Sequence, residues 1–82
     1  MFLQIGLRGF VITFNREQFG ENIIRERQAK GWQQKDLAKK IGESSAVLSA
    51  WELGKHLPGL QQLLVLSSVL RVPVSRLLGG KH

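Results

Sequence analysis

The chain has 82 residues, which suits a single domain near the lower end of what folds without help. It contains no cysteine, which excludes a disulfide framework and a cysteine-based zinc site. Twelve lysine and arginine residues against six acidic residues give a net charge of +6. That charge favours a polyanionic partner, most often nucleic acid and less often an anionic membrane surface.

Residues 1–15 are expected to form an N-terminal extension. The run FVITF, Phe10 to Phe14, is rich in β-branched and aromatic residues and predicts a short strand. The apolar stretch around it is shorter than the ~20 residues of a membrane span, and it lacks the pattern of a secretory signal. A lone strand leaves its edges unpaired. Pairing with the same strand of a second subunit is therefore favoured over a disordered leader or a start codon assigned too far upstream.

Helical periodicity begins after Asn15, a residue type that caps helices at their N-terminus. A second helix is expected over residues 34–41. Its apolar face contains Leu37 and Ala38, and lysines take the opposite face. Gly42 follows where a left-handed C-terminal cap is needed, because a residue without a Cβ adopts that conformation without strain.

A third helix is expected over about residues 44–53, with Ser44 as its N-cap. Leu48 and Trp51 are three residues apart and, together with Val47, are expected to point inward.

The rest of the chain predicts two more helices. The fourth contains apolar residues at helical spacing, with one serine among them: Leu60, Leu63, Leu64, Ser67 and Leu70. Pro73 suits the first position of a last helical turn that runs through Leu78. The sequence therefore predicts an all-α fold, a small five-helix bundle over residues 16–79 that follows the extension.

Several motifs together resemble the Cro/CI-type (Xre-like) helix-turn-helix family of prokaryotic repressors over residues 19–78. They are DLA in the second helix, the glycine turn, LSAWELGK at the end of the third helix, and PGLQQL at the start of the fourth. The resemblance implies a lambda-repressor-like bundle that binds double-stranded DNA, with its third helix in a major groove.

The resemblance also implies roles for individual residues. Gln34 matches a glutamine that meets a DNA phosphate together with the N-terminus of its helix. Lys55 matches a loop lysine at the DNA backbone, and His56 lies beside it. Arg27 and Glu52 match an ion pair that is partly buried and fixes geometry more than it stabilises.

The positions that match the DNA-facing surface carry only short side chains. They are Ser44, Ser45, Ala46, Ser49 and Ala50. Many relatives place glutamine, arginine, asparagine or lysine at several of these positions. Those side chains are long enough for bidentate contacts with bases. Three accounts compete: close approach of a bare helix to the bases, recognition of DNA shape, or a domain that has become a protein-binding module.

The favoured function is that of a cytoplasmic, nucleoid-associated transcription repressor that binds an inverted-repeat operator as a homodimer. An antitoxin that holds a toxin and a restriction-system controller are related alternatives. The segments KDLAKKI and GKHLPGLQQ are also similar to the multiprotein bridging factors, adaptors that bind the transcription machinery. The sequence shows no carboxylate pair, nucleophile–base set or ligand cluster, so we expect no enzyme activity, metal or cofactor.

Overall fold

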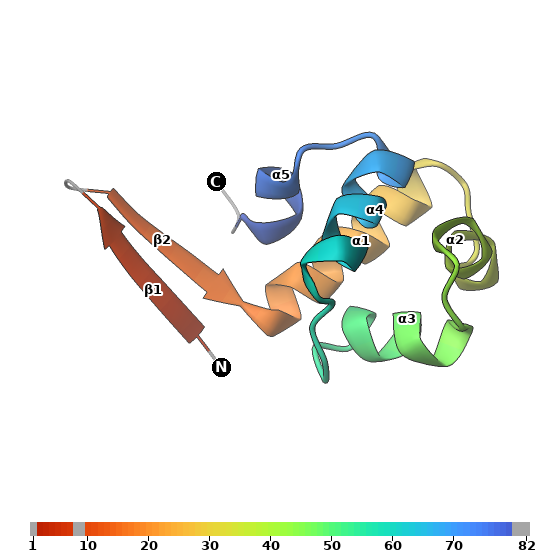
Figure 1. The fold of residues 1–82 in the computed structure, drawn as a ribbon, viewed down its shortest axis with the longest axis horizontal. Coiled ribbons are helices and arrows are strands. Elements are labelled where there is room, and N and C mark those ends of the chain that lie inside the picture. The colour runs from red at the N-terminus through yellow and green to blue at the C-terminus, as the bar shows by residue number, and fades with distance from the viewer. Residues whose placement is uncertain (1, 8–9, 80–82) are drawn as a thin grey trace.

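The computed structural model describes residues 2–7 and 10–79, which form a two-stranded hairpin followed by five helices (Figure 1). The elements are β1 (Phe2–Leu7), β2 (Phe10–Asn15), α1 (Arg16–Ala29), α2 (Gln34–Ile41), α3 (Ser45–Glu52), α4 (Leu60–Leu70) and α5 (Val74–Leu78). The predicted five-helix bundle is confirmed. None of the helices in these residues is both long and apolar enough to cross a membrane.

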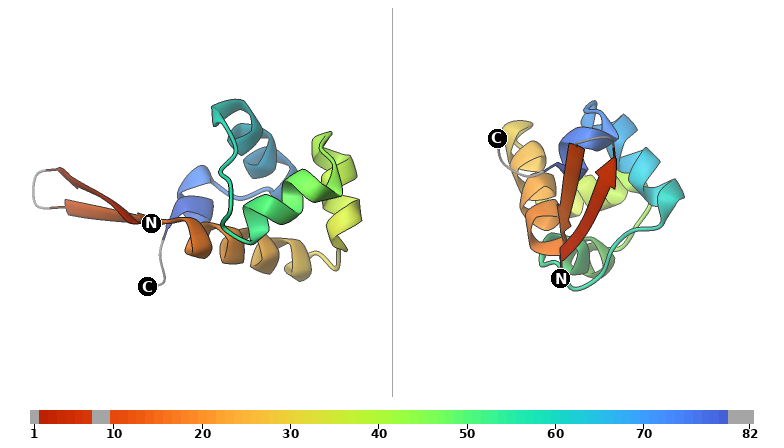
Figure 2. Two further views of the ribbon diagram at one scale, coloured as in Figure 1. Left: turned by 90° about the horizontal axis from the view of Figure 1, so that it is seen from below. Right: turned by 90° about the vertical axis from the view of Figure 1, so that its left-hand side faces the viewer.

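The N-terminal extension differs from the prediction in one respect. The run Phe10 to Phe14 lies in a strand, as predicted, but this strand is not alone. It pairs antiparallel with β1 of the same chain, with Ile5 opposite Ile12. The first strand was not predicted because Gln4 and Gly6 weaken its β-propensity signal. The hairpin reaches away from the helices (Figures 1 and 2).

The hairpin joins the helical body without a linker. Asn15 is the last residue of β2 and also the N-cap of α1. Its side-chain Oδ1 accepts hydrogen bonds from the backbone N–H groups of Glu17 at 2.8 Å and Gln18 at 3.3 Å. The residue type that predicted the start of the helix therefore also ends the strand.

The core is a single cluster to which all five helices contribute. Its buried apolar residues are Phe19, Ile23, Leu37, Ala38, Leu48, Trp51, Leu66, Leu70, Val72 and Leu77. The inward positions predicted for α2 are confirmed, as are two of the three predicted for α3. Val47 is the exception, with an exposed fraction of 38%.

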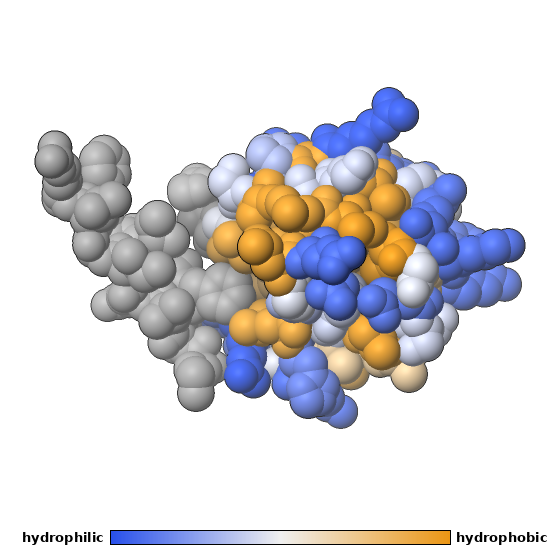
Figure 3. Space-filling model, in the orientation of Figure 1, coloured by the Kyte–Doolittle hydropathy of each residue, from blue (hydrophilic) through white to orange (hydrophobic). Residues whose placement is uncertain are grey.

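Only part of the set of residues predicted at helical spacing in α4 turns inward. Leu66 and Leu70 are buried, whereas Leu60 and Leu64 are 73% and 54% exposed. The stretch is apolar on nearly all sides, so its sequence pattern does not specify which face turns inward. The exposed leucines contribute to an apolar area that covers α4 and α5 on one face of the molecule (Figure 3).

The last helix is held by a buried asparagine of α1. Nδ2 of Asn22 donates to the carbonyl oxygens of Leu77 and Gly79, both at 2.8 Å. Its Oδ1 accepts from Nε2 of Gln18 and from Nη1 of Arg25. These bonds satisfy a polar side chain that is 1% exposed, and they connect the two ends of the helical body.

The close crossing of α1 and α3 depends on a glycine. A Cβ atom at Gly20 would lie 2.2 Å from the carbonyl oxygen of Glu52 and 2.7 Å from that of Trp51. Both atoms belong to the backbone, so neither can move without shifting α3. Only glycine fits this position.

We expect Gly20→Ala to lower the free energy of unfolding by about 2–3 kcal/mol, the range of an overpacked core. The backbone clash must outweigh the gain of about 1 kcal/mol in helix propensity. Gly59→Ala is the matched control, because its Cβ would meet only the flexible end of Gln62. Urea unfolding should show little change for the control. Equal stability of the two variants would contradict the close crossing.

Candidate nucleic-acid interface

A tight turn connects α2 and α3. Gly42 adopts the left-handed conformation, with φ 74° and ψ 28°, and its N–H donates to carbonyl oxygens of the last turn of α2. Two residues later, Oγ of Ser44 accepts the N–H of Val47 at 3.1 Å and caps α3. The small side chain of Ala38 is buried beside this turn. The chain thereby reverses between two helices of eight residues each.

The carboxylate of Glu52 fixes the orientation of α3. Its Oε2 lies 2.8 Å from Nε of Arg27, and its Oε1 accepts from Nη2 of Arg27 at 3.3 Å and from Nε2 of Gln34 at 2.9 Å. The guanidinium also donates to the carbonyl oxygen of Trp32 at 2.9 Å. The side chains of Glu52 and Arg27 are 4% and 12% exposed. One carboxylate therefore ties α1 and α2 to the end of α3, in the ion pair that the family resemblance implies.

The outward surface of α3 consists of small side chains. Ser45 and Ala46 are exposed, and Ser49 and Ala50 are half-buried. Seen from below, α3 lies in front of the helical body, between α2 and the loop that leads to α4 (Figure 2, left). The structure thus gathers these four residues on one side of α3, where Ser45 and Ala46 are left exposed by the described residues. Ser44 lies exposed at the N-terminal end of the same helix.

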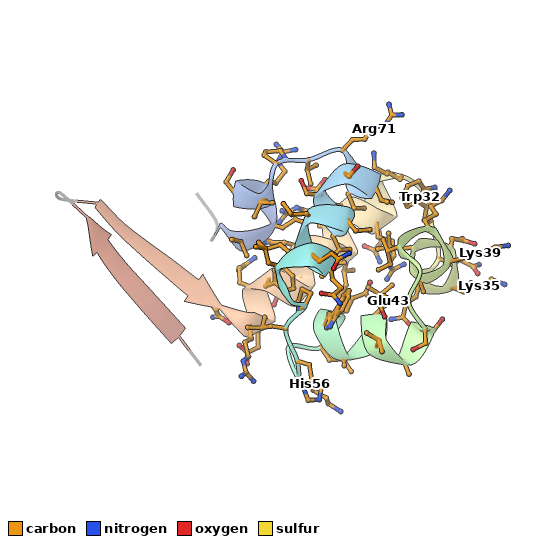
Figure 4. The ribbon with its side chains drawn as sticks, in the orientation of Figure 1. Trp32, Lys35, Lys39, Glu43, His56 and Arg71 are labelled. Atoms are coloured by element: carbon orange, nitrogen blue, oxygen red, sulfur yellow. The ribbon has the colours of Figure 1, made fainter. Side chains whose placement is uncertain are left out.

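The loop after α3 brings two basic side chains to its C-terminal end. The N–H groups of Lys55 and His56 donate to the carbonyl oxygen of Ala50, at 2.9 and 3.3 Å. Both side chains are exposed, and His56 projects at the lower edge of the molecule (Figure 4). Together with residues of α3, His56 lines a shallow hollow of about 300 Å³. Its lining is Ala46, Val47, Ala50, Trp51 and His56.

Gln34 occupies the first position of α2, and its side chain is turned inward to Glu52. The resemblance implies a phosphate contact for this side chain as well as for the helix N-terminus. The first N–H groups of an α-helix have no partner within the helix and are suited to an anion. In this structure the amide of Gln34 helps to position α3, and at the start of α2 the carboxylate of Asp36 accepts the N–H of Gln33 at 2.8 Å.

Sequence reasoning missed two residues that hold the helices together, Gly20 at the crossing of α1 and α3 and Asn22 between α1 and the end of α5. An isolated glycine within a helical pattern is a known signal of close packing, so Gly20 was detectable. Asn22 gave no such signal, because its partners are carbonyl oxygens more than fifty residues away. The bond between Gln34 and Glu52 was missed for the same reason.

A model of the helix-turn-helix family matches residues 23–77. The chain belongs to the Cro/CI-type helix-turn-helix family. It is 36% identical over 64 residues to the SPbeta prophage-derived HTH-type transcriptional regulator YonR of Bacillus subtilis (strain 168). It is 40% identical over 50 residues to multiprotein-bridging factor 1 of Schizosaccharomyces pombe. These alignments cover 78% and 61% of this chain, but only 59% and 34% of those two relatives.

Solved structures of the family have the same architecture. The P22 c2 repressor, solved in complex with a synthetic operator, superposes with a TM-score of 0.72 at 33% identity, over 77% of this chain and 96% of the repressor chain. The restriction-modification controller protein C.AhdI of Aeromonas hydrophila superposes with a TM-score of 0.71 at 28% identity, over 74% and 92% of the two chains.

We expect Glu52→Met to lower the free energy of unfolding by about 3 kcal/mol, because it leaves the guanidinium of Arg27 largely buried without its carboxylate. Adding Arg27→Met should recover part of this loss, with a coupling energy above about 1 kcal/mol in a double-mutant cycle. Glu21→Met, at an exposed position of α1, is the control and should be nearly neutral. Strict additivity of the two substitutions would contradict the role of the pair.

Proposed function

We propose that this protein is a sequence-specific DNA-binding transcription regulator that acts as a repressor. It binds an inverted-repeat operator in double-stranded DNA as a homodimer, with α3 in the major groove. The observation that carries the proposal is the uncovered surface of α3. This helix is anchored by Leu48 and Trp51 and oriented by Glu52, and its exposed residues are small apart from Val47.

The small side chains suit close approach to base edges. The hydroxyl groups of Ser45 and Ser49 can donate to or accept from bases, and the methyl groups of Ala46 and Ala50 suit the methyl group of thymine. The apolar hollow between α3 and His56 lies where such a methyl group would enter. This arrangement favours direct contact of a bare helix over recognition through DNA shape alone.

Affinity would come from contacts with the phosphate backbone on both sides of α3. Lys55 and His56 supply cationic and polar groups at one end, and the start of α2 at Gln34 supplies backbone N–H groups at the other. In a dimer, the two copies of α3 would meet half-sites about 34 Å apart, one turn of the double helix.

We expect Ala46→Leu and Ala50→Leu to abolish specific operator binding, because the added bulk keeps α3 from approaching the bases. The fold should be unaffected, since leucine is a good helix former at the exposed position of Ala46 and the open hollow beside the half-buried Ala50 can take the added bulk. Ser45→Ala should weaken binding by about 1 kcal/mol, the value of one hydrogen bond. Operator affinity is the measurement, on an operator recovered by selection from genomic fragments.

Ala29→Leu is the matched control for this series, because Ala29 is exposed at the end of α1, outside the proposed surface. It should bind like the parent chain, and circular dichroism should show equal helix content for all variants. If both leucine variants of α3 bind the operator as tightly as the parent chain, α3 is not the recognition helix.

We expect Lys55→Ala to weaken specific and non-specific DNA binding about equally. Removal of one phosphate contact should flatten the slope of log affinity against log salt by about 1. Arg71→Gly also removes one positive charge, from the side of the molecule opposite His56, the neighbour of Lys55 in the chain (Figure 4). It keeps the left-handed conformation at that position available, and should leave the slope unchanged. Equal effects of the two substitutions would mean that only net charge matters.

A second candidate function is that of an adaptor between transcription proteins. It is favoured by the similarity to multiprotein-bridging factor 1 and by a basic hollow of about 620 Å³ on a side of the molecule remote from His56 (Figure 4). Trp32 lies in this hollow with Nζ of Lys40 4.7 Å from its ring centroid, and Arg71 lines it. An adaptor would select no DNA sequence from genomic fragments, whereas a repressor would.

A further inference from the structure

Three helices end around one hollow on the side of the molecule remote from His56 (Figure 4). Lys30 is the C-cap of α1, Lys40 lies in the last turn of α2, and Arg71 is the C-cap of α4. The fold therefore brings three cations from distant parts of the chain to one place. We refer to this site as the basic hollow, which has a volume of about 620 Å³ and is lined by Lys30, Trp32, Lys40, Val69 and Arg71.

Acidic side chains do not compensate the charge of the basic hollow. Its lining contains no aspartate or glutamate. Among residues 2–7 and 10–79, no carboxylate forms an ion pair with Lys30, Lys40 or Arg71. A cation at a helix C-terminus stabilises the helix dipole, but each helix end carries only about half a negative charge. Three full charges therefore leave a net positive potential in the hollow.

Arg71 occupies a backbone position that favours glycine. Its φ of 59° and ψ of 43° are left-handed, and within the described residues no other non-glycine residue has a positive φ. The C-cap of α2 has the same conformation and is a glycine, Gly42. The side chain of Arg71 is exposed, so packing of the core does not require it. A residue kept in an unfavourable conformation for no structural gain indicates a role for its guanidinium.

Trp32 holds the two ammonium groups of the hollow in place. Nζ of Lys40 lies 4.7 Å and Nζ of Lys30 lies 5.8 Å from the centroid of its ring, which are distances of cation–π contacts. Trp32 itself packs against the core. Each ammonium retains N–H donors for an anion. Because these cations are already ordered, binding an anion costs less conformational entropy than it would with free lysine side chains.

We propose that the basic hollow binds an acidic segment of a partner protein, in which carboxylates flank an aliphatic side chain. The carboxylates meet the two ammonium groups and the guanidinium of Arg71, which can hold a carboxylate by two parallel hydrogen bonds. The aliphatic side chain lies against Val69, the aliphatic residue of the lining. Clustered cations recognise acidic motifs in this way, and the net charge of +6 attracts such a segment from a distance.

The extent of the surface suits a segment of several residues. The volume of the basic hollow lies in the range of about 300–1,000 Å³ that is typical of binding pockets. An adjoining hollow of about 450 Å³ shares Trp32 and Lys40 with it and adds Lys39. Asp36 also lines this second hollow, but its carboxylate accepts the N–H of Gln33 at 2.8 Å and so has a partner within the chain. An extended acidic segment can therefore follow the basic side chains from α4 to α2.

Nucleic acid, the other common polyanion, fits this hollow less well. Single strands are bound by bases that stack on aromatic rings, whereas the ring of Trp32 already has Nζ of Lys40 over it. The hollow lies away from His56, so a duplex bound along α3 leaves it open (Figure 4). The inference goes beyond the proposed repressor, since it needs no DNA, and rests on the adaptor candidate for the existence of a protein partner.

A synthetic acidic peptide tests the proposal with the full chain and without DNA. The probe is a fluorescein-labelled peptide in which glutamates flank single leucines, and its control has glutamine in place of every glutamate. Anisotropy should show binding of the probe that weakens as salt screens the charges, and no binding of the control. With unlabelled peptide, the emission of Trp32 should change, because Trp51, the other tryptophan, is only 5% exposed.

Substitutions in and beside the hollow locate the peptide. Lys40→Glu should weaken peptide binding at least about tenfold, because it replaces an attraction by a repulsion. Lys35→Glu makes the same charge change at an exposed position of the same helix outside both linings, and should weaken binding by less than about threefold. Arg71→Gly should weaken binding about threefold. It should not unfold the chain, since glycine suits the left-handed conformation, and circular dichroism checks the helix content of all three variants.

Equal effects of Lys40→Glu and Lys35→Glu would overturn the proposal, because net charge alone would then explain the binding. So would equal affinity for the glutamine peptide, or no binding of the acidic peptide at about 1 mM. Oligothymidine that binds more tightly than the peptide, with the same response of Trp32, would assign the hollow to single-stranded nucleic acid instead. Operator affinity is measured separately, so failure of the repressor proposal does not alter the peptide result.

Discussion

The arrangement of the helices depends on the hydrogen bonds and the ion pair that the carboxylate of Glu52 forms. It is buried at the end of α3 and accepts hydrogen bonds from Arg27 of α1 and Gln34 of α2. Two charges removed from water gain little net stability, but they tolerate only one geometry. The absence of a side chain at Gly20 allows the backbone of α1 to approach close enough for the pair to form. Together the contacts of Glu52 and the glycine at position 20 set the orientation of α3 relative to α1 and α2.

Because α3 is anchored in this way, its buried residues hold the helix in place and its outward residues are free to contact a partner. Leu48, Trp51 and Glu52 are buried and hold the helix, whereas Ser45 and Ala46 are exposed. Folding therefore does not require small side chains at these two exposed positions. A bare, rigidly held helix surface can lie closer to a flat or grooved partner than one with long side chains, which would have to be ordered on contact.

Sequence reasoning predicted the elements whose signals are local. Asn15, Gly42 and Ser44 act through bonds to residues within a few positions, so the start of α1, the end of α2 and the start of α3 were predicted well. The sequence did not specify which face of α4 turns inward, because apolar residues occupy most sides of this helix. The strand β1 was missed because its partner, not its composition, makes it a strand.

The sequence likewise predicted the parts of the candidate site that depend on local spacing, and missed the bonds between residues far apart in the chain. The positions of α3 and the loop at Lys55 follow from helical spacing together with the family resemblance. The bonds of Gln34 to Glu52 and of Asn22 to the end of α5 join residues far apart in the sequence, and no local pattern reports them. Their partners become visible only when the chain is folded.

The double role of Asn15 has a geometric consequence. Because the last residue of β2 is also the cap of α1, no residue between them can absorb a change in direction. An α-helix advances about 1.5 Å and turns about 100° with each residue. Lengthening or shortening α1 by one residue at this junction would swing the hairpin around the helix axis by that angle. The orientation of the hairpin relative to α3 can thus change in evolution only in coarse angular steps, and intermediate orientations are not accessible by insertion or deletion.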